Sequence, residues 1–193
     1  NINWDYDFNV ANNLICPPYP TCLEDVDLGY QDPSECMDQY NEGDYAFLQS
    51  FLDLNDCIDV DDPLLLGEQE WEDGRLVLFK LEGNDSDHNT GNCGYDDNQL
   101  TSIPEEIGNL SELRYLKIKN TGTETFPESL GELNNLTYLY LSYNHELVSL
   151  PESIGNLSSL EGLYLGSSQF TSLPESICNI PNDCFITVPY NQL

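Results

Sequence analysis

An internal repeat is the feature that most constrains this chain. Four aligned segments each carry an apolar residue followed by proline, at spacings of 23, 24 and 23 residues: Ile103, Phe126, Leu150 and Leu173. Ahead of the last three, the chain reads L-x-x-L-x-L at 113–118, 136–141 and 160–165. Repeats of about 20–50 residues are the signature of stacked, solenoid-like architectures.

The chemistry of one repeat predicts how the copies stack. In L-x-x-L-x-L the apolar side chains alternate toward a core, as in a strand, whereas Pro-Glu-Ser favours a short helical turn on the opposite side. One repeat cannot bury its own leucines. Stacked repeats therefore share a continuous core and align their strands into a parallel sheet on one concave face.

These motifs resemble the 23-residue class of the leucine-rich repeat family, in its extracellular type. The resemblance rests on L-x-x-L-x-L together with the phrase S-[LI]-P-E-S-I-G-N-L, and it covers about 76–193, with a first strand at 76–81 and a last one within 184–193. It implies an α/β solenoid. Thr121 and Thr123 depart from the expected Asn and Leu, which predicts a weaker turn in that repeat.

The chain ahead of the repeats predicts a cap and an irregular arm. The segment 43–55 has helical apolar spacing with Asp44 as its expected N-cap, and Asp73-Gly74 between two alternating runs is typical of a hairpin. We therefore expect three parts: an acidic, Cys- and Pro-rich arm held by disulfides (1–40), a helix-plus-hairpin cap (41–75), and the repeats with their closing strand (76–193).

The basic residues are few and confined to one region. The formal net charge is −30, and all five Lys and Arg lie between residues 75 and 119. The strand pattern turns several of them outward on the concave face beside tyrosines, which predicts one binding patch: Lys80, Arg114, Tyr115, Lys117, Lys119, Tyr138, Tyr140, Tyr143 and Tyr164. The alternative is that Arg114 and Lys117 pair with neighbouring acids such as Glu112 or Glu161.

The charge also limits the partners. So acidic a chain lacks the cationic footprint that nucleic acids and anionic membranes require, and no apolar run reaches membrane-spanning length. A basic patch favours an acidic or hydroxyl-rich partner, either an acidic glycan or a second copy of this protein.

Seven cysteines predict disulfides and hence an oxidising compartment. They do not form paired C-x-x-C motifs that would indicate zinc. We expect a mature secreted or cell-surface protein whose signal peptide has been removed. The candidates for pairing are Cys16, Cys22, Cys36, Cys57, Cys93, Cys178 and Cys184, with Cys178 and Cys184 close enough to staple the final turn.

Two further kinds of site have local signals. The insertion at 86–97, together with the preceding Asp85, places oxygen ligands at EF-hand-like spacing, although Thr90 stands where such loops need glycine. Calcium is therefore the one possible cofactor, with the candidate ligands Asp85, Asp87, Asn89 and Asp96. N-x-S/T sequons, expected mostly away from the sheet, could carry glycans at Asn84, Asn109, Asn135 and Asn156.

No arrangement of residues indicates catalysis, because His88 and His145 have no identifiable nucleophile or carboxylate partner. The sequence thus predicts a protein that acts by protein–protein contact. FNVANNL (8–14) resembles FITVPYNQL (185–193), which favours head-to-tail self-assembly into an extracellular filament. The alternative is a monomeric recognition or adhesion module that binds a glycan or protein on its concave Tyr and Lys face.

Overall fold

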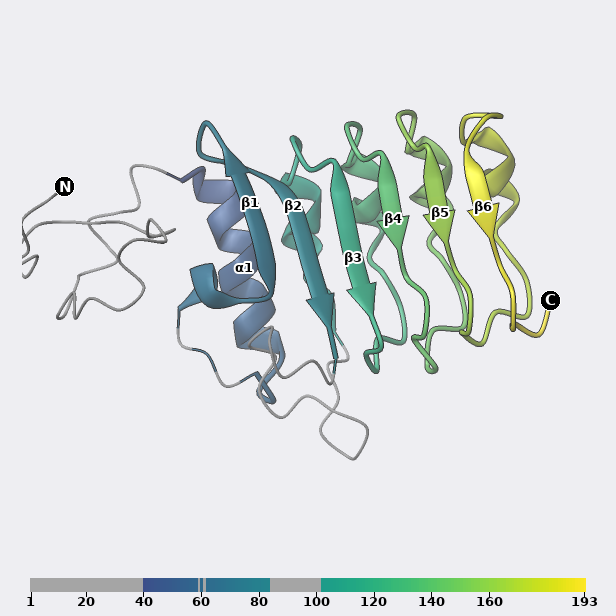
Figure 1. The fold of residues 1–193 in the computed structure, drawn as a ribbon, viewed down its shortest axis with the longest axis horizontal. Coiled ribbons are helices and arrows are strands. Elements are labelled where there is room, and N and C mark those ends of the chain that lie inside the picture. Colours follow the sequence, from purple (N-terminus) through teal and green to yellow (C-terminus); the bar gives the residue numbers. More distant parts are fainter. Residues whose placement is uncertain (1–39, 59, 61, 84–101) are drawn as a thin grey trace, which may run out of the picture. The chain divides into compact units, whose positions relative to one another are not determined.

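The computed structural model describes residues 40–58, 60, 62–83 and 102–193. The segment Asn41–Leu193 is one compact unit, built on a six-stranded sheet whose strands follow chain order from β1 to β6 (Figure 1). β1 and β2 form an antiparallel hairpin, and every later pair is parallel. The strands are β1 (Glu68–Glu72), β2 (Arg75–Glu82), β3 (Tyr115–Lys119), β4 (Tyr138–Tyr140), β5 (Gly162–Tyr164) and β6 (Phe185–Thr187).

Short helices lie behind this sheet, one for each repeat (Figure 1). Each repeat helix begins directly after the proline that the sequence placed at its start, and each is a 3-10 helix: η4 (Glu105–Asn109), η5 (Glu128–Glu132), η6 (Glu152–Asn156) and η7 (Glu175–Asn179). Two helices precede them, α1 (Glu42–Leu54) and η3 (Pro63–Leu65). The predicted strands, turns and hairpin are confirmed, and Asp73 and Gly74 both have positive φ at the hairpin turn.

The core is a ladder of leucines between the sheet and the short helices. Leu116, Leu139 and Leu163 are paired in register across β3, β4 and β5 and are completely buried. Burying such a side chain contributes about 1.5–3 kcal/mol to stability. Because successive repeats supply the same contacts, the outward positions of the strands are also held in register.

The short helices of successive repeats approach so closely that they need glycine. A Cβ atom on Gly131 would lie 2.4 Å from the Ser153 carbonyl oxygen, and one on Gly155 would lie equally close to the Ser176 oxygen. Real Cβ atoms do not come this near to backbone. The glycine of the repeat phrase is therefore a packing requirement.

Two local expectations from the sequence are wrong. Asn41 caps α1 by accepting from the amides of Gly43 and Asp44, whereas Asp44 is fully buried and accepts from Arg75 and from the Leu76 amide. An acid one turn inside the helix reaches the neighbouring strand, which explains the change of role.

The Thr121 turn is also well bonded. Both the amide and the hydroxyl of Thr121 donate to the Asn144 side-chain oxygen, at 2.9 and 2.8 Å, and the Thr121 and Thr123 hydroxyls are 2.8 Å apart. The next repeat thus supplies the acceptor that this turn needs. No helix among the residues described is long and apolar enough to cross a membrane.

Candidate functional site

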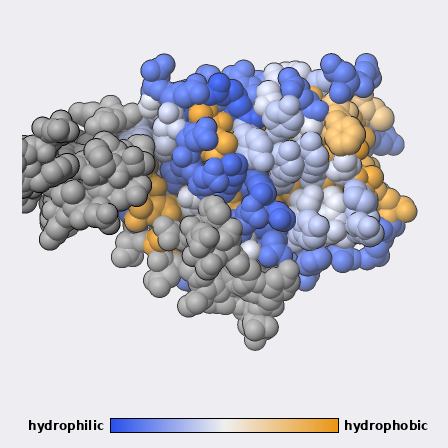
Figure 2. Space-filling view, viewed as in Figure 1, coloured by the Kyte–Doolittle hydropathy of each residue, from blue (hydrophilic) through white to orange (hydrophobic). Residues whose placement is uncertain are grey.

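The open face of the sheet, opposite the short helices, presents two rows of side chains in register. One row consists of Leu78, Tyr115, Tyr138, Gly162 and Phe185, and the other of Lys80, Lys117, Tyr140, Tyr164 and Thr187. In Figure 2 this face is mostly hydrophilic over β2 and β3, with a small hydrophobic patch at β2, intermediate over β4 and β5, and hydrophobic at β6. The face therefore changes character from charged to aromatic along the stack.

Five aromatic side chains form what we call the aromatic strip: Tyr115, Tyr138, Tyr140, Tyr164 and Phe185. The rings of Tyr140 and Tyr164 are stacked, with centroids 4.0 Å apart and planes 3° from parallel. Tyr115 stacks on Tyr140 at 5.2 Å, and Phe185 lies 6.2 Å from Tyr164. The parallel register places equivalent residues of adjacent repeats side by side, which is why the rings meet.

Gly162 is the one small residue inside the strip, and two rings cover it. A Cβ atom there would lie 2.9 Å from ring carbons of both Tyr138 and Tyr164. The Tyr138 hydroxyl donates to the Glu161 carboxylate at 2.9 Å. The absence of a side chain at 162 thus lets these two rings settle against the backbone of β5.

The phenols of Tyr115, Tyr138 and Tyr140 stay neutral at physiological pH, because the pKa of each is raised. Burial is the main cause that raises the pKa of Tyr140, and hydrogen bonding with Tyr164 raises it further. Burial also raises the pKa of Tyr115, and the hydrogen bond to Glu161 raises that of Tyr138. The strip therefore offers uncharged rings and hydroxyl groups.

The cations of the expected patch are all paired within the chain. Lys80 binds Glu68 at 2.6 Å, Arg114 binds Glu72, and Lys117 and Lys119 share Glu82. The fifth cation, Arg75, binds the buried Asp44 at 2.9 Å. Arg114 and Lys117 therefore pair with nearby acids, as the alternative expectation had it, but with Glu72 and Glu82 rather than Glu112 or Glu161. The binding patch itself stays a prediction.

The pKa directions agree with this pairing. The hydrogen bond to Glu68 is the main cause that raises the pKa of Lys80. Burial by itself would raise the pKa of Glu82, but the hydrogen bond and charge of Lys117 and the charge of Lys119 lower it overall. Both groups are therefore charged at neutral pH, and each is held in an ion pair.

Lys119 also lies over Tyr143, with its Nζ 5.1 Å from the ring centroid. Tyr143 is half-exposed and has a left-handed φ of 66°, a conformation it shares with the equivalent residues Asn120, Ser167 and Tyr190. It lies just past β4, so it borders the open face without joining the aromatic strip.

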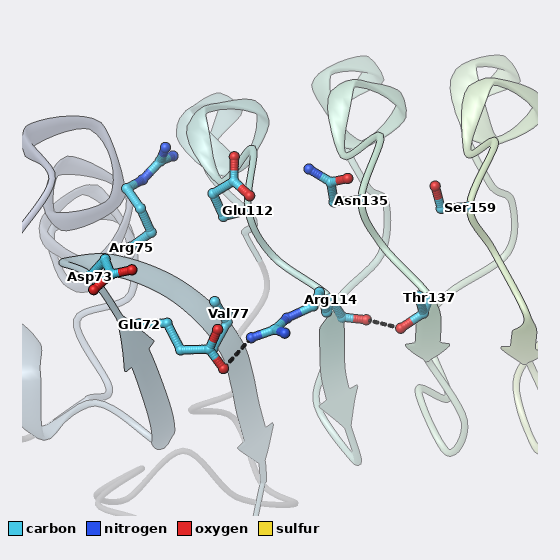
Figure 3. Close-up of a pocket in the computed structure, with 9 residues that line it drawn as sticks. All are labelled: Glu72, Asp73, Arg75, Val77, Glu112, Arg114, Asn135, Thr137 and Ser159. Atoms are coloured by element: carbon cyan, nitrogen blue, oxygen red, sulfur yellow. Dashed lines mark hydrogen bonds and ion pairs between the residues drawn. The ribbon is translucent and has the colours of Figure 1, made fainter.

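A trough runs beside the strip where the strands begin (Figure 3). It is an open pocket of about 550 Å³. In Figure 3, Glu112, Asn135 and Ser159 lie along one side, and Val77, Arg114 and Thr137 along the other. Asn135 donates to the Ser111 carbonyl at 2.8 Å and Thr137 to the Arg114 carbonyl at 2.7 Å. Equivalent positions of consecutive repeats, such as Glu112, Asn135 and Ser159, line this trough, but no motif in the sequence marks it.

Cys178 and Cys184 both carry free thiols, so the expected staple between them is wrong. Cys178 is exposed on η7, whereas Cys184 is partly buried against the core, so the two thiols face different surroundings. Burial raises the pKa of Cys184, and the charge of Asp183 raises it further. Cys57 packs in the core at 8% exposure.

Several expected sites fall outside the described residues. These are the candidate calcium ligands Asp85, Asp87, Asn89 and Asp96, the sequon at Asn84, and Cys16, Cys22, Cys36 and Cys93. The calcium site and the disulfide framework stay predictions. Among the sequons in the described part, Asn109, Asn135 and Asn156 are exposed, and Asn135 lines the trough at the edge of the sheet.

The comparison with protein families agrees with this architecture. A model described as "Leucine-rich repeat region" matches residues 93–179. The match covers less than half of the chain, and it supports a leucine-rich repeat family. Regions of this family are typically interaction modules rather than enzymes, and the fold suggests protein–protein contact. No curated protein sequence matches the chain.

Solved structures with similarity include other repeat proteins. A leucine-rich repeat protein of Leptospira interrogans is 25% identical, with a TM-score of 0.46 over 74% of this chain and 38% of that one. The plant peptide hormone receptor RGFR1, solved in complex with RGF2, is 36% identical, with a TM-score of 0.38 over 46% of this chain and 14% of that one. A plant ice-binding protein is 21% identical, with a TM-score of 0.49 over 79% of this chain and 57% of that one. This chain spans less than two thirds of the length of each.

Proposed function

We propose that this chain is a non-enzymatic, secreted recognition module that binds a protein partner on the open face of its sheet. The observation that carries the proposal is the aromatic strip, in which half-buried rings stack from β3 to β5 and continue to Phe185 on β6. Stacked tyrosines on a rigid sheet bring contact area at little entropic cost, and clustered aromatics mark interfaces.

The test places a photo-reactive benzophenone amino acid at one of two positions. In place of Tyr138 it lies in the strip, and in place of Glu175 it lies on η7, behind the sheet. We expect a cross-linked partner from position 138 only, and loss of that product when Tyr140 and Tyr164 are also replaced by alanine. A product that forms equally at both positions, or that survives the alanine changes, would contradict the proposal.

A second candidate is head-to-tail self-assembly into an extracellular structural filament. It is favoured by exposed apolar side chains at and after β6, the last strand of the described sheet: Phe185 on the strand is 62% exposed, and Leu193, beyond its end, is 57% exposed. An unpaired strand edge with apolar neighbours is a template for contact. The pairing of the cations, however, removes the basic surface that would attract an acidic second copy.

Sedimentation velocity over a range of protein concentrations distinguishes the two candidates. Self-assembly predicts species that grow with concentration and disappear in the Leu193→Asp variant. A single monomeric species at every concentration would exclude assembly and leave the recognition module.

A further inference from the structure

The free charge on the open face is negative. All five cations of the chain are paired with carboxylates. Glu112, in the trough, is exposed and makes no hydrogen bond within the described part of the chain, although its charge acts on Arg75 in the same trough. Among the described residues, Glu161 accepts one side-chain hydrogen bond, from the Tyr138 hydroxyl. Glu82 serves both Lys117 and Lys119, but in a chain of net charge −30 the acids remain in large excess over the bases.

Two lysines of the chain already lie over tyrosine rings on or beside the open face. The Lys80 Nζ lies 5.4 Å from the Tyr115 ring centroid, and the Lys119 Nζ lies 5.1 Å from that of Tyr143. Both distances are within the range of about 6 Å at which a cation is attracted to the face of a ring. The rings of Tyr138 and Tyr164 have the same chemistry but no lysine of this chain above them.

The trough lies directly beside these rings, because Arg114 and Thr137 on its wall immediately precede Tyr115 and Tyr138 in the chain. It crosses the starts of successive strands, so a ligand must be extended to occupy trough and strip together (Figure 3). Glu112 offers a carboxylate there, while Asn135 and Ser159 offer groups that can hydrogen-bond a peptide backbone.

We propose, building on the open face as the contact surface, that the strip and trough recognise an extended peptide segment carrying arginine or lysine. The cationic side chain reaches Glu112, and the adjoining residues lie on Tyr138 and Tyr164. Arginine suits the site best, because its planar guanidinium both stacks on aromatic rings and binds a carboxylate through two hydrogen bonds. An acidic glycan would instead meet Glu112 and Glu161 without a free cation.

Fluorescence anisotropy with labelled synthetic peptides tests the inference. The probe is a short peptide of alternating Arg and Gly, and its control replaces each Arg with citrulline, which keeps the shape but removes the charge. At physiological ionic strength we expect the arginine peptide to bind at least about tenfold more tightly. Equal affinity for the two peptides would overturn the inference.

Matched variants separate this site from the general acidity of the chain. Glu112→Gln and Glu175→Gln each remove one negative charge from an exposed glutamate, but only Glu112 lies in the trough. We expect about a fivefold loss of affinity for Glu112→Gln and almost none for Glu175→Gln. Equal losses would assign the binding to overall charge and overturn the inference.

The aromatic contribution has its own control. We expect the double variant Tyr138→Leu, Tyr164→Leu to lose about fivefold or more in affinity for the arginine peptide, in line with the strength of cation–π contacts. Tyr190→Leu, which changes an exposed tyrosine outside the strip, should lose nothing. Unchanged binding by the double variant would overturn the inference.

These outcomes are independent of the cross-linking test. A strip-dependent partner cross-link together with no preference for the arginine peptide would refute the cationic segment and retain the open face as contact surface. A strip-independent cross-link would refute the proposed function itself.

Discussion

Asp44 anchors α1 to the sheet, and replacing it with asparagine tests how we interpret this contact. Its side chain is completely buried and accepts three hydrogen bonds: from Arg75 Nε and NH2 at 2.9 Å each and from the Leu76 amide at 2.8 Å. An asparagine side chain has nearly the same shape as aspartate, but it is uncharged, and one of its two terminal atoms is an NH2 donor instead of an oxygen acceptor. At least one of these donors thus loses its acceptor at position 44.

The expected loss follows from these contacts. Removing one partner of a buried ion pair costs about 3–5 kcal/mol. The Arg75 side chain is 26% exposed, so water replaces part of what it loses, and one side-chain oxygen still accepts. We therefore expect Asp44→Asn to lower the free energy of unfolding by about 2–3 kcal/mol, a large share of the roughly 5–15 kcal/mol typical of a domain.

Urea unfolding followed by far-UV circular dichroism measures this difference. Asp53→Asn is the matched control, because Asp53 lies in the same helix but is exposed, with Gln49 as its hydrogen-bond partner. The control should change stability by less than about 0.5 kcal/mol. An equally small effect of Asp44→Asn would refute the view that this buried contact holds α1 to the sheet.

Three further predictions follow from packing and titration. Gly131→Ala should lower the free energy of unfolding by about 1–3 kcal/mol because its Cβ would strike backbone, whereas Gly162→Ala should cost less because it meets only movable rings; equal losses in urea would contradict this. Spectrophotometric titration at 295 nm should show Tyr140 ionising above the ordinary tyrosine pKa of 10.0. The raised pKa in the folded state contributes stability that is fully present below the pKa of the unfolded state and is lost as pH rises through the folded-state pKa. A free energy of unfolding that stays constant through this range would contradict the raised pKa. Mass-resolved alkylation of the native protein should modify the exposed Cys178 before the partly buried Cys184, whose pKa is raised, and the reverse order would contradict the placement of these thiols.

Much of the fold could be predicted because each repeat places apolar residues at the same positions and buries them in the same way. The leucines at 116, 139 and 163 recur at one position, and only a stacked parallel sheet buries all of them. The same spacing placed Tyr140 and Tyr164 outward and side by side, as the structure shows. Alternation along a strand fixes which way a side chain points, so these positions followed from the sequence alone.

The electrostatic character of the face could not be predicted in the same way. Glu82 meets Lys117 and Lys119 across two strands that are more than thirty residues apart in the chain. The pairing depends on the register of β2 against β3, which opposes Glu82 to Lys119. The insertion between these strands has no periodic spacing from which a sequence-based prediction could obtain that register.

The partner of Lys80 depends on a one-residue irregularity in the hairpin of β1 and β2. Its turn at Asp73 and Gly74 was evident from the sequence, and a regular register from that turn would oppose Glu68 to Phe79. An irregularity between Glu70 and Trp71 shifts the register by one residue and opposes Glu68 to Lys80 instead.

The sequence by itself therefore determined the solenoid, its core and the outward direction of its cations and tyrosines, because these depend on local spacing. Only the tertiary structure decided that every cation is paired with a carboxylate, with Glu82 shared by Lys117 and Lys119, and that the open face combines an aromatic strip with ion pairs. Charge pairing depends on the register between strands and on the bulge in the hairpin, and both are set by packing between distant segments.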